Sequence, residues 1–277
     1  MEGSTSSYNS SAFLLTFPSI TAIFYIMSRK IIFYNQKGGV GKTTAAVSLA
    51  SVLAAKGFKV LLIDLDAQVN LTHAVSGDPK KANIYQVITG QVDARDAVQS
   101  TLFQNLYLIP GSLDLAGLAI ELVEEDNREQ FLKKSLSVID KDYDYILLDC
   151  PPSLGLETVN ALCWCDDVII PLQCEYLAME GLNLIMRTIT NIKKTVNPNI
   201  RILGILFTMY SRRIRLNQDV VDDISAYFPD LVFKTIIPRS SRLAEAPSHG
   251  LPINYYDKSS AGAKAFVKLS EEVINRG

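Results

Sequence analysis

Short apolar runs alternate along most of the chain with longer stretches in which apolar residues recur every three or four positions. The short runs are apolar almost throughout rather than at every second residue, which is typical of strands buried on both faces of a parallel sheet. Seven runs are predicted to be strands: 30–34, 60–64, 106–110, 145–149, 168–172, 202–208 and 232–238. The pattern predicts an α/β fold, a doubly wound, mainly parallel sheet with helices on both faces.

The helical half of the pattern is clearest between residues 175 and 196. Its apolar residues are three and four positions apart and form one stripe, so this segment is predicted to be a helix that faces the core. The stripe consists of Leu182, Ile185, Ile189, Ile192 and Val196. We find no internal repeat and no Gly/Ser linker within residues 28–277, so this range is predicted to be a single domain.

Residues 1–27 do not follow this pattern. They are polar and Ser-rich at first and then mostly apolar from Ala12 to Met27, with Pro18 in the middle. No basic residue precedes the apolar run, unlike in a signal peptide, and the run is shorter than the ~20 apolar residues of a membrane-spanning helix. We interpret the segment as an N-terminal extension outside the fold, either disordered or produced by a start codon placed upstream of a natural start at Met27. An anchor or a partner-binding arm is the alternative.

Composition narrows the classes of function. The 277 residues are 48% hydrophobic and 20% charged, which is typical of a globular protein. A net charge of −2 gives no overall attraction to nucleic acid or to an anionic membrane, so any such binding requires a local basic patch. The cysteines lack paired CxxC spacing and are interpreted as reduced, mostly buried thiols of a cytosolic protein, with a metal site as the alternative. They are Cys150, Cys163, Cys165 and Cys174.

The glycine-rich segment KGGVGKTT connects a predicted strand to a predicted helix. Such a turn directs several backbone N–H groups at one point, at the positive end of the helix dipole, and so favours a phosphate. Lys42 is expected to reach the β- and γ-phosphates of a nucleotide, and Thr43 to ligate Mg²⁺. Gln36 stands where the usual P-loop has its first glycine, and Lys37 is an additional lysine. The expected nucleotide-binding residues are Lys37, Gly38, Gly39, Val40, Gly41, Lys42, Thr43 and Thr44.

Acidic residues stand at the carboxyl ends of two other predicted strands. Asp149 is expected to hold Mg²⁺ opposite the glycine-rich loop, and Asp64 is a further candidate metal ligand. Asp66 is a weak base that can still orient an attacking water, and we assign it that role. N-capping of the following helix is the alternative for Asp66.

Longer segments carry a resemblance to a known family. KGGVGKTT, VLLIDLDAQVN, DYILLDCPPSLG, IIPLQCEYLAMEGL, GILFTMY and IIPRSSRLAEAPSHGLPI resemble the ParA/Soj chromosome and plasmid partitioning ATPases. These belong to the deviant Walker-A class of P-loop NTPases, which also contains the MinD proteins and the nitrogenase iron protein. The similarity runs from Lys30 to Ile274. It implies a slow, Mg²⁺-dependent ATPase with Lys37, Lys42 and Asp66 as catalytic residues.

The resemblance also implies an ATP-dependent homodimer. In this class the additional lysine contacts the phosphates bound by the other subunit; by motif position this lysine is Lys37, and Gly38 is implied to lie tight against the partner. A ParB-like centromere-binding protein is implied to stimulate hydrolysis, and a cytoplasmic, nucleoid-associated location follows.

Non-specific DNA binding is implied as well. Arg213 and Arg242 match DNA-contacting arginines of the family, and the sequence adds Arg212, Arg215 and Arg239 nearby. Phosphate binding requires clustered basic groups and little else. Taken without the resemblance, the cluster is interpreted as a solvated surface.

Two residues depart from the family pattern, and other functions remain open. The family's usual DPQGN reads DAQVN here, so that Ala67 and Val69 are expected to alter the loop after Asp66 and the rate of hydrolysis rather than the fold.

The alternative functions are those of a MinD-like membrane-cycling ATPase, an iron–sulfur carrier, and a ligase that activates a carboxylate. The C-terminal segment mixes acidic and basic residues and is predicted to be a packed helix, so no membrane partner is expected. Cys150 is interpreted as part of a buried wall rather than as a cluster ligand.

Overall fold

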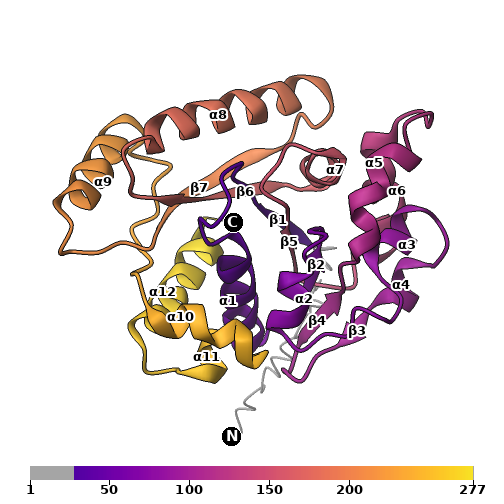
Figure 1. Cartoon of the computed structure of the whole chain (residues 1–277), viewed down its shortest axis with the longest axis horizontal. Coiled ribbons are helices and arrows are strands. Elements are labelled where there is room, and N and C mark those ends of the chain that lie inside the picture. Colours follow the sequence, from indigo (N-terminus) through magenta and orange to yellow (C-terminus); the bar gives the residue numbers. More distant parts are fainter. Residues whose placement is uncertain (1–27, 277) are drawn as a thin grey trace, which may run out of the picture.

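A seven-stranded sheet forms the centre of the molecule (Figure 1), with strand order β3-β4-β2-β5-β1-β6-β7. The computed structural model describes residues 28–276, so the interpretations of residues 1–27 concern a segment outside the described residues. Six strands run parallel and confirm the predicted fold class. They are β1 (Arg29–Phe33), β2 (Val60–Asp64), β4 (Leu106–Ile109), β5 (Tyr145–Asp149), β6 (Asp167–Gln173) and β7 (Arg201–Thr208).

The last of the seven predicted strands is wrong. Residues 232–238 lie along β7 but form only two isolated bridges with residues 205 and 210. The backbone N–H groups of Lys234 and Thr235 donate instead to the Glu272 carboxylate, at 2.8 and 2.7 Å, which interrupts a continuous ladder. The seventh strand is β3 (Gln99–Ser100), a two-residue antiparallel edge strand beside β4 that has no apolar pattern of its own.

One face of the sheet is covered by α1 (Lys42–Ala55) and the C-terminal helix α12 (Ala261–Asn275), which lie side by side. The apolar residues of α12, among them Phe266, Leu269 and Val273, are buried in the core of this face. The C-terminal helix is therefore packed, as predicted. The same face holds the short helices α2 (Asn70–Ala74), α10 (Ser241–Glu245) and α11 (Ile253–Tyr256).

The opposite face is covered mainly by α7 (Leu156–Trp164), α8 (Ala178–Thr195) and α9 (Arg215–Tyr227). The predicted stripe of α8 is confirmed, because Leu182, Ile185 and Ile189 are buried against the sheet and the last two members are half-buried. Four shorter helices complete this layer: α3 (Ile84–Ile88), α4 (Ala94–Ala97), α5 (Leu118–Glu121) and α6 (Phe131–Leu136). Among residues 28–276, no helix combines the length and apolar character needed to cross a membrane.

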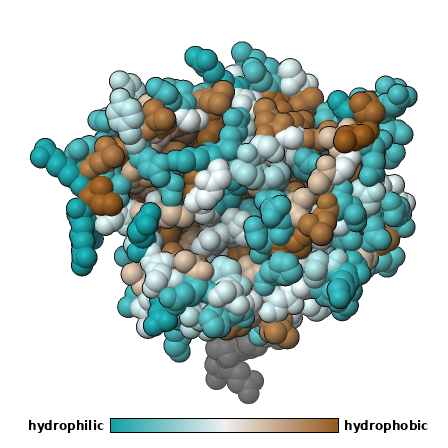
Figure 2. Space-filling view, in the orientation of Figure 1, coloured by the Kyte–Doolittle hydropathy of each residue, from teal (hydrophilic) through white to brown (hydrophobic). Residues whose placement is uncertain are grey.

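The core is apolar on both sides of the sheet, whereas the surface is mixed. All four cysteines are buried free thiols, as predicted. The face in Figure 2 carries separate apolar patches among polar side chains rather than one continuous apolar surface. The polar residues of greatest interest are those buried at the carboxyl ends of β1, β2 and β5, where Asp149 stands in register with both Phe33 and Asp64.

Candidate nucleotide site

The phosphate loop is the turn between β1 and α1. Gly39 and Gly41 have φ values of +73° and +90°, a left-handed conformation that glycine adopts without steric cost, and Gly41 is the N-cap of α1. Gly38 and Gly39 are exposed at the tip of the loop, and Val40 is buried. Thr44 lies half-buried in the first turn of α1. The sequence expectation of a glycine turn leading into a helix is met by this geometry.

Asn35 holds the loop in place, a role that sequence reasoning missed. Its side-chain amide donates to the Pro171 carbonyl of β6 at 2.8 Å, and its Oδ1 accepts the Lys37 N–H at 2.9 Å. Asn35 is only 4% exposed. A buried amide between an apolar strand and a glycine-rich turn requires partners, and this requirement is the signal that could have identified it.

Lys42 lies across the loop rather than in solvent. Its Nζ donates to the carbonyl oxygens of Asn35 and Lys37, at 3.0 and 3.2 Å. Desolvation lowers the pKa of Lys42, although the nearby Asp149 acts in the opposite direction. A phosphate in the loop would exchange these two neutral acceptors for charged ones, which form stronger hydrogen bonds.

The Thr43 hydroxyl donates to Asp149 Oδ2 at 2.5 Å, and Asp149 is fully buried. Burial raises the pKa of Asp149 to about 8, with a further contribution from the neighbouring Asp64. The other carboxylate oxygen, Oδ1, has no hydrogen-bond partner among residues 28–276. A hydroxyl, a carboxylate and a spare buried oxygen are hard donors that suit Mg²⁺. These two residues therefore fit the predicted metal site.

Asp64 is more fully engaged in hydrogen bonds. Its Oδ2 accepts the Thr72 N–H at 2.9 Å and the Thr72 hydroxyl at 2.8 Å, while Oδ1 accepts the Asp66 N–H at 3.2 Å. Burial raises the pKa of Asp64 to about 6. The carboxylate thus fixes the chain that follows β2, and its assignment as a metal ligand stays a prediction. Thr72 was not identified from the sequence.

Asp66 is half-buried, and its charge acts on both Lys42 and Asp149. Its Oδ1 accepts the Gln68 N–H at 3.0 Å, and its carbonyl accepts the Val69 N–H at 2.9 Å, closing a tight turn. The N-capping alternative is wrong, because the N-cap of α2 is Val69. Asp66 therefore has no helix-capping role, and its charge acts on the two charged groups named above.

Val69, which departs from the family pattern given above, adopts a left-handed backbone conformation. Its φ is +59°, which costs a residue with a side chain about 1–2 kcal/mol. A β-branched residue is especially unfavourable there. The side chain is buried, at 5% exposure, so the surrounding contacts retain the strained turn. The departure from the family pattern is accommodated without a change of fold.

Lys37 differs from Lys42 in its surroundings. The Lys37 side chain is 56% exposed and forms an ion pair with Glu175, which follows β6. The two lysines of the loop are thus separated: one is buried within the loop and one stands at its outer edge.

The arginines lie on two adjoining segments. The Arg239 N–H donates to the Tyr210 carbonyl at 2.9 Å, which brings residue 239 beside the segment 211–215 that follows β7. Arg212, Arg213, Arg215 and Arg239 are exposed, and none of the four forms an ion pair within the described residues.

Arg242 is also exposed, but it is paired with Glu245 at 3.1 Å and with Asp257 at 3.7 Å. The arginine segments connect to the phosphate loop through Thr208 at the end of β7, whose hydroxyl donates to the Val40 carbonyl at 2.8 Å. The basic residues and the nucleotide site are therefore linked by one strand end.

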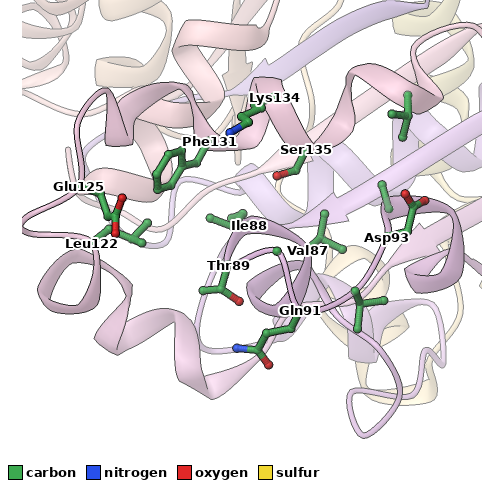
Figure 3. A pocket seen from close by; sticks show the side chains of 14 residues that line it. Val87, Ile88, Thr89, Gln91, Asp93, Leu122, Glu125, Phe131, Lys134 and Ser135 are labelled. Carbon is green, nitrogen blue, oxygen red and sulfur yellow. The ribbon is translucent and has the colours of Figure 1, made fainter.

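A separate cleft of about 590 Å³ opens between α3 and α6. Phe131, Lys134 and Ser135 of the α6 region face Val87 and Ile88 of α3 across it (Figure 3). None of its lining residues belongs to the phosphate loop or to the arginine segments. The cleft is thus distinct from the site that the motifs define.

The fold and the loop define a P-loop nucleotide-binding protein, and comparison with known proteins specifies the family. A family described as "AAA domain" matches residues 28–202. The chromosome-partitioning ATPase Soj of Treponema pallidum is 46% identical over 250 residues, covering 90% of this chain and 98% of that protein. The sporulation initiation inhibitor protein Soj of Bacillus subtilis is 44% identical over 253 residues, covering 91% and 100%.

A solved structure has the same fold and contains a bound nucleotide analogue. Cobyrinic acid a,c-diamide synthase of Mycobacterium smegmatis, with a bound ATP analogue and magnesium, superposes with a TM-score of 0.80 at 36% identity, covering 90% of this chain and 94% of that one. This chain belongs to the Soj/ParA family of chromosome-partitioning ATPases. It is an ATPase, and its phosphate loop together with Thr43 and Asp149 fits a nucleotide with Mg²⁺.

Proposed function

We propose that this partitioning ATPase is an ATP-driven dimerisation switch, that residues 28–277 act as one domain, and that the dimer binds DNA without sequence preference to segregate or position chromosome or plasmid cargo. The observation that carries the proposal is the separation of the two loop lysines. Lys42 is buried within its own loop, whereas Lys37 is 56% exposed at its edge, where a second subunit can approach. A cation supplied in trans neutralises charge that develops during phosphoryl transfer.

Within one subunit, the remaining roles follow from the contacts. The backbone N–H groups of the loop and Lys42 bind the phosphates, and Thr43 with Asp149 holds Mg²⁺. When bound, Mg²⁺ neutralises phosphate charge. Asp66 orients the attacking water. The Asp64 carboxylate positions Asp66 by accepting the Asp66 backbone N–H at 3.2 Å. Since Asp66 is a weak base, hydrolysis by the isolated protein is slow.

DNA binding is assigned to Arg213 and Arg242, supported by Arg212, Arg215 and Arg239. One subunit offers a small basic surface on a chain of net charge −2. A two-fold dimer doubles the number of phosphate contacts, and since each contact releases counterions, affinity rises steeply. Dimerisation therefore controls DNA binding.

Partner and location follow from the same cycle. A ParB-like centromere-binding protein accelerates hydrolysis and so releases the dimer from DNA. The protein acts in the cytoplasm on the nucleoid, without a membrane partner. The packing of α12 supports this point, since its apolar residues are buried against the core rather than available for lipid.

A ligase is the second candidate, because the M. smegmatis structure carries the name of a synthase. Partitioning is favoured because the two Soj relatives have higher identities, 46% and 44%, over nearly their whole lengths. The two candidates differ in their expected response to DNA.

The test is binding of residues 27–277 to non-specific duplex DNA with ATP, with ADP and without nucleotide, over a series of salt concentrations. Tight binding is expected only with ATP, weakened by salt, and lost in Lys37→Ala and in the Arg213→Ala/Arg242→Ala double variant. Lys56→Ala serves as the control, because Lys56 is a lysine at the other end of α1. Binding that is absent, or equal with and without ATP, while ATP is still hydrolysed would show that the proposal is wrong.

A further inference from the structure

The ion pair between Lys37 and Glu175 joins two segments that are 138 residues apart in sequence. Lys37 follows β1 and Glu175 follows β6, and these two strands are neighbours in the sheet. The Glu175 N–H donates to the Gln173 carbonyl at 3.0 Å, which turns the chain back toward the phosphate loop. Glu175 thus stands beside the loop because of the sheet order.

The same contact places Lys37 under two competing demands. In the proposed dimer the Lys37 ammonium contacts phosphates held by the other subunit. In the single subunit it contacts a carboxylate of its own chain. We treat the two contacts as alternatives, so that forming the dimer breaks this ion pair in each subunit.

We propose that Glu175 is a positioning residue that retains Lys37 within its own subunit and so opposes dimerisation until nucleotide is bound. The inference rests on the proposed role of Lys37 in trans. A triphosphate carries several negative charges and is less exposed to water between two subunits, so it outcompetes a single exposed carboxylate. Without ATP, the carboxylate has no such competitor and the subunits stay apart.

The solvent exposure of the Lys37–Glu175 ion pair sets how much the pair changes the dimer dissociation constant. Both side chains are about half exposed, at 56% and 51%, so water and salt weaken their attraction. Two such pairs break per dimer. Exposed ion pairs of this kind correspond together to a two- to thirtyfold change, roughly, in the dimer dissociation constant. The contact adjusts the threshold for dimerisation and does not abolish it.

Glu180 provides a matched control. It lines the same cleft of about 440 Å³ as Lys37 and Glu175, together with Leu172, Leu177 and other residues. Glu180 is exposed and forms no ion pair within residues 28–276. Glu180→Gln therefore removes the same charge from the same cleft without removing the contact with Lys37.

The experiment is analytical ultracentrifugation of the full chain with a non-hydrolysable ATP analogue and Mg²⁺, at low and at high salt. Glu175→Gln is expected to lower the dimer dissociation constant about two- to thirtyfold at low salt, and the difference is expected to shrink at high salt. Glu180→Gln is expected to stay within about twofold of the unmodified chain. In a Lys37→Ala background, Glu175→Gln is expected to have no further effect, since the pair no longer exists.

Three outcomes would overturn the inference, and they are distinguishable from one another. If Glu175→Gln weakens the dimer, Glu175 supports Lys37 in the dimer instead of retaining it. If Glu175→Gln and Glu180→Gln shift the dimer dissociation constant by the same amount, or if neither shifts it, the contact between Glu175 and Lys37 does not oppose dimerisation. If the unmodified chain stays monomeric with the analogue, or Lys37→Ala dimerises normally, the proposed function itself fails and the inference fails with it.

Discussion

The phosphate loop, which follows β1, and the arginine segments, the first of which follows β7, differ in how the chain supports them. Asn35, Lys42 and Thr43 each bond to a partner within the chain, and Lys42 is only 6% exposed. Arg212 and Arg213, in contrast, are exposed and lack an ion pair within the described residues. The nucleotide site is thus organised within one chain, whereas the role in DNA binding that we propose for the arginines depends on external phosphates and on a second subunit.

The largest effect is expected for a substitution in the phosphate loop, on the rate of ATP hydrolysis. Lys42→Ala removes a positioned cation from the phosphates, and we expect ATP hydrolysis to fall about 10²–10³-fold. Steady-state phosphate release measures this loss. Lys56→Ala, at the exposed end of α1, is expected to leave the rate unchanged. A Lys42→Ala rate within a few-fold of the unmodified chain would show that the contacts within the loop do not define the site.

The arginine segments are expected to show a smaller and graded response. Arg213→Ala removes one phosphate contact per subunit, so we expect DNA affinity to fall on the order of ten- to hundredfold and the salt slope to decrease by about two in a dimer. Arg242→Ala is expected to have a smaller effect, because Arg242 is already paired with Glu245 and Asp257. Fluorescence anisotropy with ATP over a salt series measures both. Equal losses would show that these intrachain pairs do not reduce the contribution of Arg242.

The third prediction concerns the pH dependence of Mg²⁺ binding at the buried Asp149 of the nucleotide site. Burial raises the pKa of Asp149 to about 8, so below this pH a proton occupies the carboxyl group that we propose as a Mg²⁺ ligand. Metal binding has to release this proton. The Mg²⁺ affinity is therefore expected to rise about tenfold per pH unit up to about pH 8 and to level off above it. Calorimetry in buffers of different ionisation enthalpy measures the released proton. A Mg²⁺ affinity that stays constant from about pH 6.5 to about pH 8.5 would contradict the raised pKa of Asp149.

The smallest effect concerns the turn after Asp66. Ala67 is the second residue of the turn that the Val69 N–H closes on the Asp66 carbonyl, and its own N–H donates no hydrogen bond within residues 28–276. Ala67→Pro should therefore fit the turn, reduce the freedom of the unfolded chain and stabilise the fold by about 0.4–1 kcal/mol. The melting temperature is expected to rise by about 1–4 °C. Ala67→Gly, which adds freedom instead, should lower it, and a fall in both variants would exclude this account.

The main features of the nucleotide site are local in sequence and could be predicted. A glycine turn between an apolar strand and a helix organises phosphate-binding N–H groups over only a few residues, so Lys42 and Thr43 could be identified by their spacing alone. Asp149 could be found because it ends an apolar strand, and parallel strands bring their carboxyl ends to one edge.

Contacts between distant segments could not be predicted in this way. Residues 232–238 have the composition of a strand, but the Glu272 carboxylate of α12 binds two of their backbone N–H groups. The partners of Asp64 and the αL conformation of Val69 likewise depend on how the chain after β2 returns to the sheet. Local propensity does not contain this information, because it arises from packing between elements.

The sequence by itself determined the alternation of strands and helices, the phosphate loop and the acidic strand ends, because each depends on neighbouring residues. The tertiary structure decided which polar groups meet. It brought Asn35 to Pro171, Arg239 to Tyr210 and Lys37 to Glu175. The contacts of Asn35 and Lys37 follow from the strand order, in which β1 and β6 are neighbours, so that residues more than a hundred positions apart meet at one edge of the sheet. Only the folded sheet could show that the additional lysine of the loop has a partner in its own chain.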